Sequence, residues 1–234
     1  MCKKCRQRDG DPPTPKRVRS SHTAAMRQAA WIALVLAATA SRVFAQSVDT
    51  LPHLDISIDE RRLWVVAPTG DTLFTAPVAV GSGRTLRTDG RSWVFHTPRG
   101  ETIVRAKEVA PLWIPPDWHY VELARKLGLH TTQLTYDQPV RLGDGSLLLV
   151  RNGRAGVLGA DSVFRALPVD EEIIFGERLF IPPFGTSNRR VAGVLGPYRL
   201  LLANGVGLHG TPHKESIGTA ATHGCIRLHD QDIT

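Results

Sequence analysis

The chain has 234 residues and a formal net charge of +7, a balance often found in proteins that bind nucleic acid or anionic lipid. The excess lies entirely in residues 1–45, where nine basic side chains face two acidic ones, so residues 46–234 carry 20 of each sign. Binding a phosphate backbone requires clustered positive charge in the folded part, which argues against a nucleic-acid partner. A hydrophobic content of 42% and a charged content of 22% are typical of a globular domain.

Residues 26–45 have the layout of a secretory signal peptide. Arg27 precedes the apolar run Ala29–Ala38, and the segment ends at Ala45. A membrane-spanning helix needs about 20 apolar residues, so we expect cleavage after the run and no stable membrane span. This predicts an exported protein of the periplasm or cell wall.

Residues 1–25 are interpreted as a basic disordered lead or as sequence upstream of the true start at Met26. Cys2 and Cys5 form a lone C-x-x-C without a second pair, which we interpret as a chance pair, since zinc needs four ligands. Cleavage would then leave Cys225 as the single cysteine. In an oxidising compartment such a residue must be buried, paired between chains or used chemically.

The exported part, residues 46–234, is predicted to be one domain that is mainly β with minor helix. Prolines 111, 115 and 116, interleaved with Trp113 and Trp118, predict a rigid aromatic loop without regular helix. Apolar spacing predicts one short helix over 119–129, and the longer stretch 117–184 is interpreted as a β-rich insertion. Alternating or β-rich patterns predict strands at 55–59, 62–66, 72–80, 92–96, 101–107, 198–202 and 207–210.

The chemistry is concentrated in residues 209–234. A thiol needs a base or a positive environment to ionise near neutral pH, and His209 and His223 are the candidate bases for Cys225. Gly224 allows a tight turn that presents backbone amides to an oxyanion. Arg227 lies on the same side as Cys225 if the chain is extended there, and could hold an anionic group.

H-G-T at 209–211, followed by T-H-G-C-I-R-L at 222–228, resembles the signature of the L,D-transpeptidase catalytic domain family, the YkuD type. The resemblance implies that family's mixed-sheet, β-sandwich-like fold with a catalytic loop carrying H-G-C. Further segments occur in the family's order: 62–66, 78–81, 97–100, 196–198 and 207–210.

The resemblance also implies the roles of individual residues. Cys225 would be the nucleophile and His209 the proton acceptor and donor, oriented by the backbone carbonyl of Gly210. His223 and Gly224 would shape the oxyanion region. The residues implied in substrate binding are Arg227, Thr222 and Thr211.

The implied reaction needs no cofactor and acts on peptidoglycan stem peptides, forming 3-3 cross-links with release of D-Ala. Hydrolysis by an L,D-carboxypeptidase, exchange with a D-amino acid, and non-catalytic peptidoglycan binding remain alternatives. A carbapenem is expected to form an adduct at Cys225.

A zinc hydrolase is a less favoured alternative, suggested by four histidines and one cysteine between His209 and His229. Gly210 and Pro212 disfavour the helix that an i, i+4 pair of zinc ligands would need. The family usually continues beyond the position of Thr234, so we expect that the C-terminal end is truncated.

Overall fold

The computed structural model describes residues 51–88 and 90–234. The basic lead and the predicted signal peptide lie outside these residues. The described part is mainly β, with α1 (Asp117–Leu127) as its α-helix and with the short 3-10 turns η1 (Ser187–Arg189) and η2 (Lys214–Ser216). The predicted fold class, mainly β with minor helix, is confirmed.

Two sheets share the first core. One is antiparallel and contains β1 (His53–Ser57), β2 (Arg62–Val66) and β3 (Thr72–Pro77), in that order. The other runs β18-β16-β15-β7, with β7 (Val104–Val109), β15 (Tyr198–Leu202), β16 (Gly207–His209) and β18 (Ile226–Arg227). This second sheet is mixed, because β18 pairs parallel to β16 while the other pairs are antiparallel. Their shared core contains Leu63, Ala76, Val78, Val80, Leu202, Leu208, Ile226 and Leu228.

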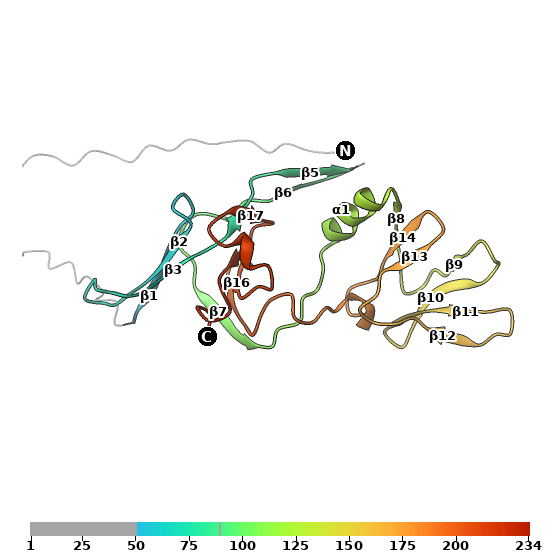
Figure 1. Cartoon of the computed structure of the whole chain (residues 1–234). Coiled ribbons are helices and arrows are strands. Elements are labelled where there is room, and N and C mark those ends of the chain that lie inside the picture. The colour runs from blue at the N-terminus through green and yellow to red at the C-terminus, as the bar shows by residue number, and fades with distance from the viewer. Residues whose placement is uncertain (1–50, 89) are drawn as a thin grey trace, which may run out of the picture. The chain divides into compact units, whose positions relative to one another are not determined.

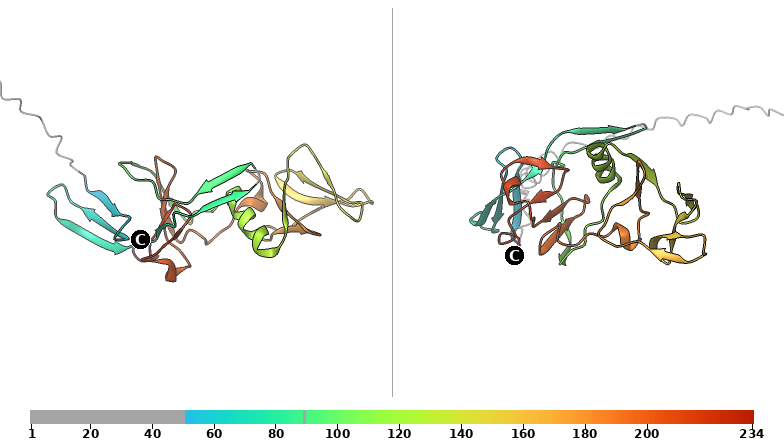
Figure 2. Two further views of the ribbon diagram at one scale, coloured as in Figure 1. Left: turned by 90° about the horizontal axis from the view of Figure 1, so that it is seen from above. Right: turned by 45° about the vertical axis from the view of Figure 1, so that its right-hand side comes forward.

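Short elements near these sheets bring distant segments of the chain together. β4 (Val80–Gly81) pairs in parallel with β17 (Ala220–Thr222), which leads into the H-G-C segment. β5 (Thr85–Thr88) and β6 (Arg91–Val94) form a hairpin that runs alongside α1 (Figures 1 and 2). Leu86, Phe95 and Val121 form the buried contact between the hairpin region and the helix.

The helix begins two residues earlier than the sequence predicted. Pro116 occupies the N-cap position, Asp117 follows it with its carboxylate in the first turn, and Gly128 ends the helix in the left-handed conformation. Trp118 is therefore helical, and its assignment to a rigid loop was wrong. The error has a physical cause: a proline restricts the residue before it and is tolerated at a helix start, so the three prolines do not exclude a helix behind them.

The predicted insertion is β-rich and has cores of its own. β8 (His130–Gln133), β13 (Ile173–Phe175) and β14 (Arg178–Ile181) form one sheet, and α1 packs on it through Tyr120 and Ala124. A second sheet has the order β12-β11-β10-β9, with β9 (Val140–Arg141), β10 (Leu147–Arg151), β11 (Arg154–Leu158) and β12 (Phe164–Ala166). A further buried cluster contains Leu134, Leu142, Leu148, Ala155, Ile173 and Phe180.

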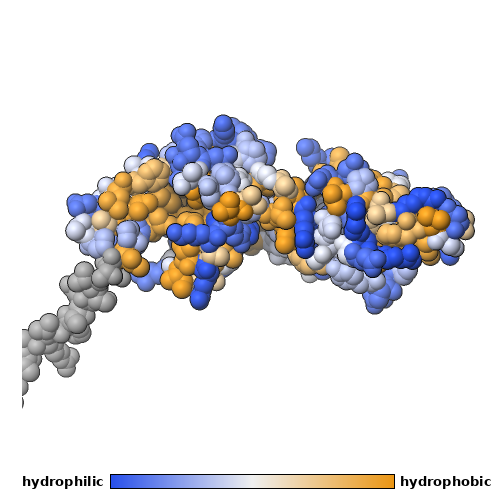
Figure 3. All heavy atoms as spheres, turned by 90° about the horizontal axis from the view of Figure 1, so that it is seen from below, coloured by the Kyte–Doolittle hydropathy of each residue, from blue (hydrophilic) through white to orange (hydrophobic). Residues whose placement is uncertain are grey.

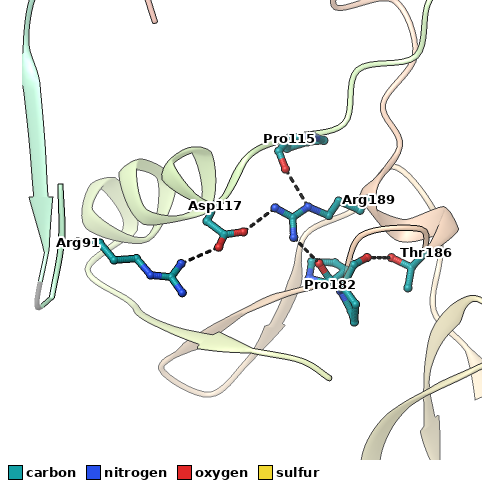
Figure 4. A network of polar contacts seen from close by, with 7 residues as sticks. Arg91, Pro115, Asp117, Pro182, Thr186 and Arg189 are labelled. Carbon is teal, nitrogen blue, oxygen red and sulfur yellow. Dashed lines mark hydrogen bonds and ion pairs between the residues drawn. The ribbon is translucent and has the colours of Figure 1, made fainter. Parts of the chain in front are cut away.

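A buried arginine ties together the two chain segments at the root of the insertion. Arg189 has no exposed surface, and its guanidinium donates to the carbonyls of Pro115 and Pro182, at 2.8 Å each, and to Asp117 Oδ1 at 2.6 Å (Figure 4). Asp117 also accepts from Arg91 at 2.7 Å. The entering and the returning segment are thus fixed by one side chain.

The surface of the described part is mixed. On the face drawn in Figure 3, apolar residues lie in separate areas interrupted by hydrophilic side chains, as on most folded domains. Within residues 51–88 and 90–234, no helix is long and apolar enough to cross a bilayer.

Candidate active site

Strand alternation in β16 and β18 places the candidate catalytic side chains on one face of the sheet. His209 pairs with Arg227, and Leu208 pairs with Ile226, in parallel register. Leu208 and Ile226 point into the shared core, so His209 and Arg227 point to the opposite face. Cys225 precedes β18 by one residue and lines the same cavity as His209 and Arg227.

The cavity measures about 740 Å³ and is lined by both the central sheet and the insertion. Such a volume suits a small peptide or a comparable ligand. Its sheet wall carries Arg199, Gly207, His209, Cys225 and Arg227. Its other walls include Trp113, Trp118, His119, Glu122, Asp170, Glu171, Glu172, His213, Thr222 and His223.

The proton position on His209 follows from its hydrogen bond. Nδ1 lies 2.6 Å from the carbonyl oxygen of Gly210, and because that oxygen can only accept, Nδ1 must carry the proton. The lone pair is then on Nε2. Burial has the largest effect on the pKa of His209 and lowers it to about 4, although the hydrogen bond to Gly210 acts to raise it. The ring is therefore neutral near pH 7 and can accept a proton.

Close backbone contact explains the glycine at 210. A Cβ on Gly210 would lie 2.3 Å from Asp230 Oδ1 and 3.0 Å from a ring carbon of Pro197. The same Asp230 oxygen accepts the amide of Thr211 at 2.9 Å. The absence of a side chain at 210 therefore lets the chain turn tightly after His209 and direct the carbonyl back to the ring.

The segment before the cysteine is held by two threonine hydroxyls. Thr222 Oγ1 donates to the carbonyl of Cys225 at 2.6 Å and accepts the amide of Gly224 at 3.1 Å. Thr97 Oγ1 donates to the carbonyl of Gly224 at 2.9 Å and accepts the amide of Gly81 at 2.8 Å. None of these bonds uses the amide of Cys225, the donor expected for an oxyanion. Gly224 has φ +126°, a conformation that side-chain-bearing residues rarely adopt.

His223 is held by the helix of the insertion. Its Nε2 lies 2.8 Å from Glu122 Oε2, its ring stacks on Trp118 at 3.9 Å between centroids, and Phe95 packs edge-on at 4.4 Å. No sequence motif assigns a site role to Glu122 or Thr97, although Thr97 begins the segment 97–100 that follows the family's order. Both contacts join positions more than 100 residues apart.

The residues predicted to bind substrate lie in different environments. Arg227 is half-buried in the cavity wall, where burial lowers its pKa while Cys225 and Glu215 oppose that change. Thr222 reaches the cavity, although its hydroxyl is engaged by the loop. Thr211 is 1% exposed and its hydroxyl accepts the amide of His213, so its position favours bracing the turn after His209.

The described residues bring together no group of three or more His, Cys, Asp or Glu side chains suited to holding a metal ion. The histidines of the H-G-T and H-G-C segments instead have separate partners: a carbonyl for His209 and a carboxylate for His223.

Comparison with known proteins assigns the family. The model of the L,D-transpeptidase catalytic domain, YkuD, matches residues 52–234. The chain belongs to this L,D-transpeptidase family. The match includes the strands of both sheets, the insertion and the H-G-C segment, so the fold expected from the sequence resemblance is confirmed.

A solved L,D-transpeptidase structure, residues 123–326 from Xylanimonas cellulosilytica DSM 15894, is similar to this L,D-transpeptidase domain at 13% identity and a TM-score of 0.37. The alignment covers 78% of this chain and 51% of that one, so the chain spans about half the length of that structure. No curated protein matches the chain.

Proposed function

We propose that the chain is an exported L,D-transpeptidase that acts on peptidoglycan stem peptides through an acyl-enzyme on Cys225. One observation carries the proposal: the bond from His209 Nδ1 to Gly210 leaves Nε2 free to accept a proton, in a cavity that also holds Cys225. Family membership supports the peptidoglycan substrate. Export rests on the signal-peptide pattern of residues 26–45.

The first half-reaction transfers the stem peptide to the thiol. His209 Nε2 takes the proton of Cys225, and the sulfur attacks the carbonyl of the L,D-amide between stem residues three and four. The amide of Cys225 donates to the oxyanion that forms. Collapse breaks the C–N bond, and the protonated His209 gives its proton to the leaving nitrogen, which departs as D-Ala.

The second half-reaction regenerates the thiol. An amine of a neighbouring stem attacks the thioester carbonyl, His209 takes the amine's proton, and Cys225 leaves as the thiolate. The thiolate then takes that proton from His209, which restores the thiol and the neutral base. The product is a 3-3 cross-link. Water as acceptor would give an L,D-carboxypeptidase, and a free D-amino acid would give exchange, with the same residues in the same roles.

Arg227 is the residue that we assign to an anionic group of the stem. It lies on the face of the sheet that carries His209 and lines the cavity beside Cys225. Arg199 lines the same wall, but its guanidinium bonds Glu108 at 2.7 Å. Because Glu108 already occupies Arg199, a carboxylate of the donor stem would bind Arg227 more readily than Arg199.

The test uses disaccharide-tetrapeptide as substrate and mass spectrometry of the products. We expect wild type to release D-Ala and to form a dimer, while Cys225→Ala releases none and His209→Ala loses most of the turnover. A carbapenem should add its mass to Cys225 in wild type only. A tripeptide product alone would identify a carboxypeptidase, and incorporated D-amino acid an exchange enzyme.

Two outcomes would contradict the thiol mechanism. One is full turnover by Cys225→Ala. The other is activity that EDTA abolishes while alkylation of Cys225 leaves it intact, which would favour the zinc alternative. Wild type that binds the substrate without changing its mass would favour a peptidoglycan-binding role.

A further inference from the structure

The first helix of the insertion contacts the catalytic loop through two side chains on one face. Trp118 and Glu122 are four residues apart on α1, the spacing that brings helical side chains together. Both touch His223: the indole stacks at an interplanar angle of 11°, and the carboxylate bonds Nε2 at 2.8 Å. The aromatic contact and the polar contact therefore fix the same ring from two directions.

The bond to Glu122 determines where His223 carries its proton. A carboxylate only accepts, so Nε2 must be protonated. Burial lowers the pKa of His223, and Glu122 opposes this, while Arg227 and Arg84 add to the lowering. Near pH 7 the ring is accordingly neutral with its proton on Nε2.

The position of the His223 ring affects the nucleophile because residues 222–225 form a short, tightly bonded turn. Thr222 and Thr97 fix the carbonyls of Cys225 and Gly224. Neither hydroxyl bonds the side chain of His223, which directly follows Thr222 in the sequence. The hydrogen bond and the ring contacts of that side chain go to Glu122, Trp118 and Phe95.

We propose that Glu122 is a positioning residue: together with Trp118 it holds His223 in one orientation and so fixes the Gly224–Cys225 turn for acyl transfer. This inference rests on the proposed function. It makes the insertion part of the active site, because the helix that begins the insertion supplies both contacts. Glu122 itself takes no proton and forms no bond with substrate in this role.

The test compares Glu122→Gln, which keeps an oxygen acceptor, with Glu122→Ala, which removes it. The control is Glu177→Gln, the same chemical change at an exposed position of the same insertion, between β13 and β14. A misplacement of about 1 Å can cost about 100-fold in rate, so we expect kcat to fall about 10-fold in Glu122→Gln and about 100-fold in Glu122→Ala. KM should change less than about 3-fold, and Glu177→Gln should match wild type.

Two readouts do not require the peptidoglycan reaction. Nitrogen NMR should show the Nε2–H tautomer of His223 in wild type, and a lower pKa of His223 in Glu122→Gln, because the carboxylate no longer opposes the effect of burial. Alkylation of Cys225 by iodoacetamide, followed by peptide mass, should be slower in Glu122→Gln and Glu122→Ala than in wild type. Glutathione added to the same solution serves as the reference thiol, whose rate should be the same with every variant.

The outcomes separate the two proposals. Unchanged kcat, alkylation rate and His223 pKa in Glu122→Gln would overturn the positioning role, even if wild type cross-links stem peptides. Wild type without turnover, but with the expected NMR and alkylation changes, would overturn the proposed function and leave the positioning role standing. Should Glu122→Ala not fold by circular dichroism, Glu122→Gln decides the matter.

Discussion

Thr97 is the residue that ties the catalytic turn to the rest of the fold. Its hydroxyl joins the amide of Gly81, in β4, to the carbonyl of Gly224, 127 residues away in sequence from Thr97. The side chain is 7% exposed, so water has little access to replace either bond. Whatever displaces Thr97 will also displace the residue next to the nucleophile.

Replacing Thr97 by valine tests this link, because valine has a similar shape and no hydroxyl. We expect Thr97→Val to lower the free energy of unfolding by about 1–3 kcal/mol, the cost of a buried polar group without a partner, and to lower kcat. Urea unfolding and the D-Ala release assay measure the two effects. Thr102→Val, at an exposed position, is the matched control; equal stability of both variants would show that the bridge contributes nothing.

Among single residues, the sequence predicted those of the H-G-T and H-G-C motifs but not the distant residues whose side chains hydrogen-bond to the H-G-C segment. His209, Gly210 and Cys225 lie in recognisable local patterns, and the bond between the first two joins neighbouring residues. Thr97 begins the segment 97–100, which follows the family's order, but neither Thr97 nor Glu122 carries a local signal of its partner. Their partners lie 127 and 101 residues away, and only the tertiary fold brings them together.

Among the elements, α1 joins the insertion to the rest of the domain through polar side-chain contacts at both its first residue and Glu122. Its first residue, Asp117, bonds the buried Arg189 and the more exposed Arg91. Burial raises the pKa of Asp117, but the bonds from the two arginines outweigh it and hold that pKa below the ordinary value of 3.8. The carboxylate thus stays ionised at any pH where the protein is expected to work.

Removing the arginine at the root of the insertion should be costly. Arg189→Ala leaves Asp117 without its buried partner and leaves two carbonyls, those of Pro115 and Pro182, without donors. We expect a loss of about 3–5 kcal/mol in the free energy of unfolding, measured in urea.

The neighbouring arginine provides the control. Arg190 is exposed, and Arg190→Ala should change stability by about 0.5 kcal/mol or less. Similar values for the two variants would contradict the role that Figure 4 gives to Arg189.

Most elements could be predicted from sequence because their patterns are local. The turn at Asn152-Gly153, where both residues have positive φ, joins β10 and β11 as turn chemistry predicts. The predicted start of α1 is two residues late because the prediction excludes a helix after Pro115 and Pro116 as well as before them. The pairing of β14 with β8 in parallel could not be predicted, since nothing local specifies which of several short strands become neighbours.

For the whole domain, stability should depend on pH through the buried base. The folded pKa of His209, about 4, lies below the ordinary value of 6.5, so the unfolded chain binds the proton more readily. The stabilisation from the neutral ring is therefore complete above 6.5 and is lost as pH falls toward 4. Between pH 7 and pH 5 the expected loss from this residue is about 2 kcal/mol.

Urea unfolding at the two pH values measures this contribution. The glutamine in His209→Gln cannot gain a proton. Between pH 7 and pH 5 the free energy of unfolding of this variant should therefore fall by about 2 kcal/mol less than that of wild type. His53→Gln removes a histidine that is half exposed and should behave as wild type. Identical pH dependence of all three proteins would contradict the buried neutral state of His209.

The register of β16 against β18 links correct folding to activity, so the folded fraction of a preparation can be measured. A slip of either strand by one residue would exchange His209 or Arg227 for a leucine or an isoleucine on the cavity face, and would push a polar ring or a cation into the core. Misregistered molecules would thus be both unstable and inert. Titration of active thiols in a preparation would therefore count the correctly folded molecules directly.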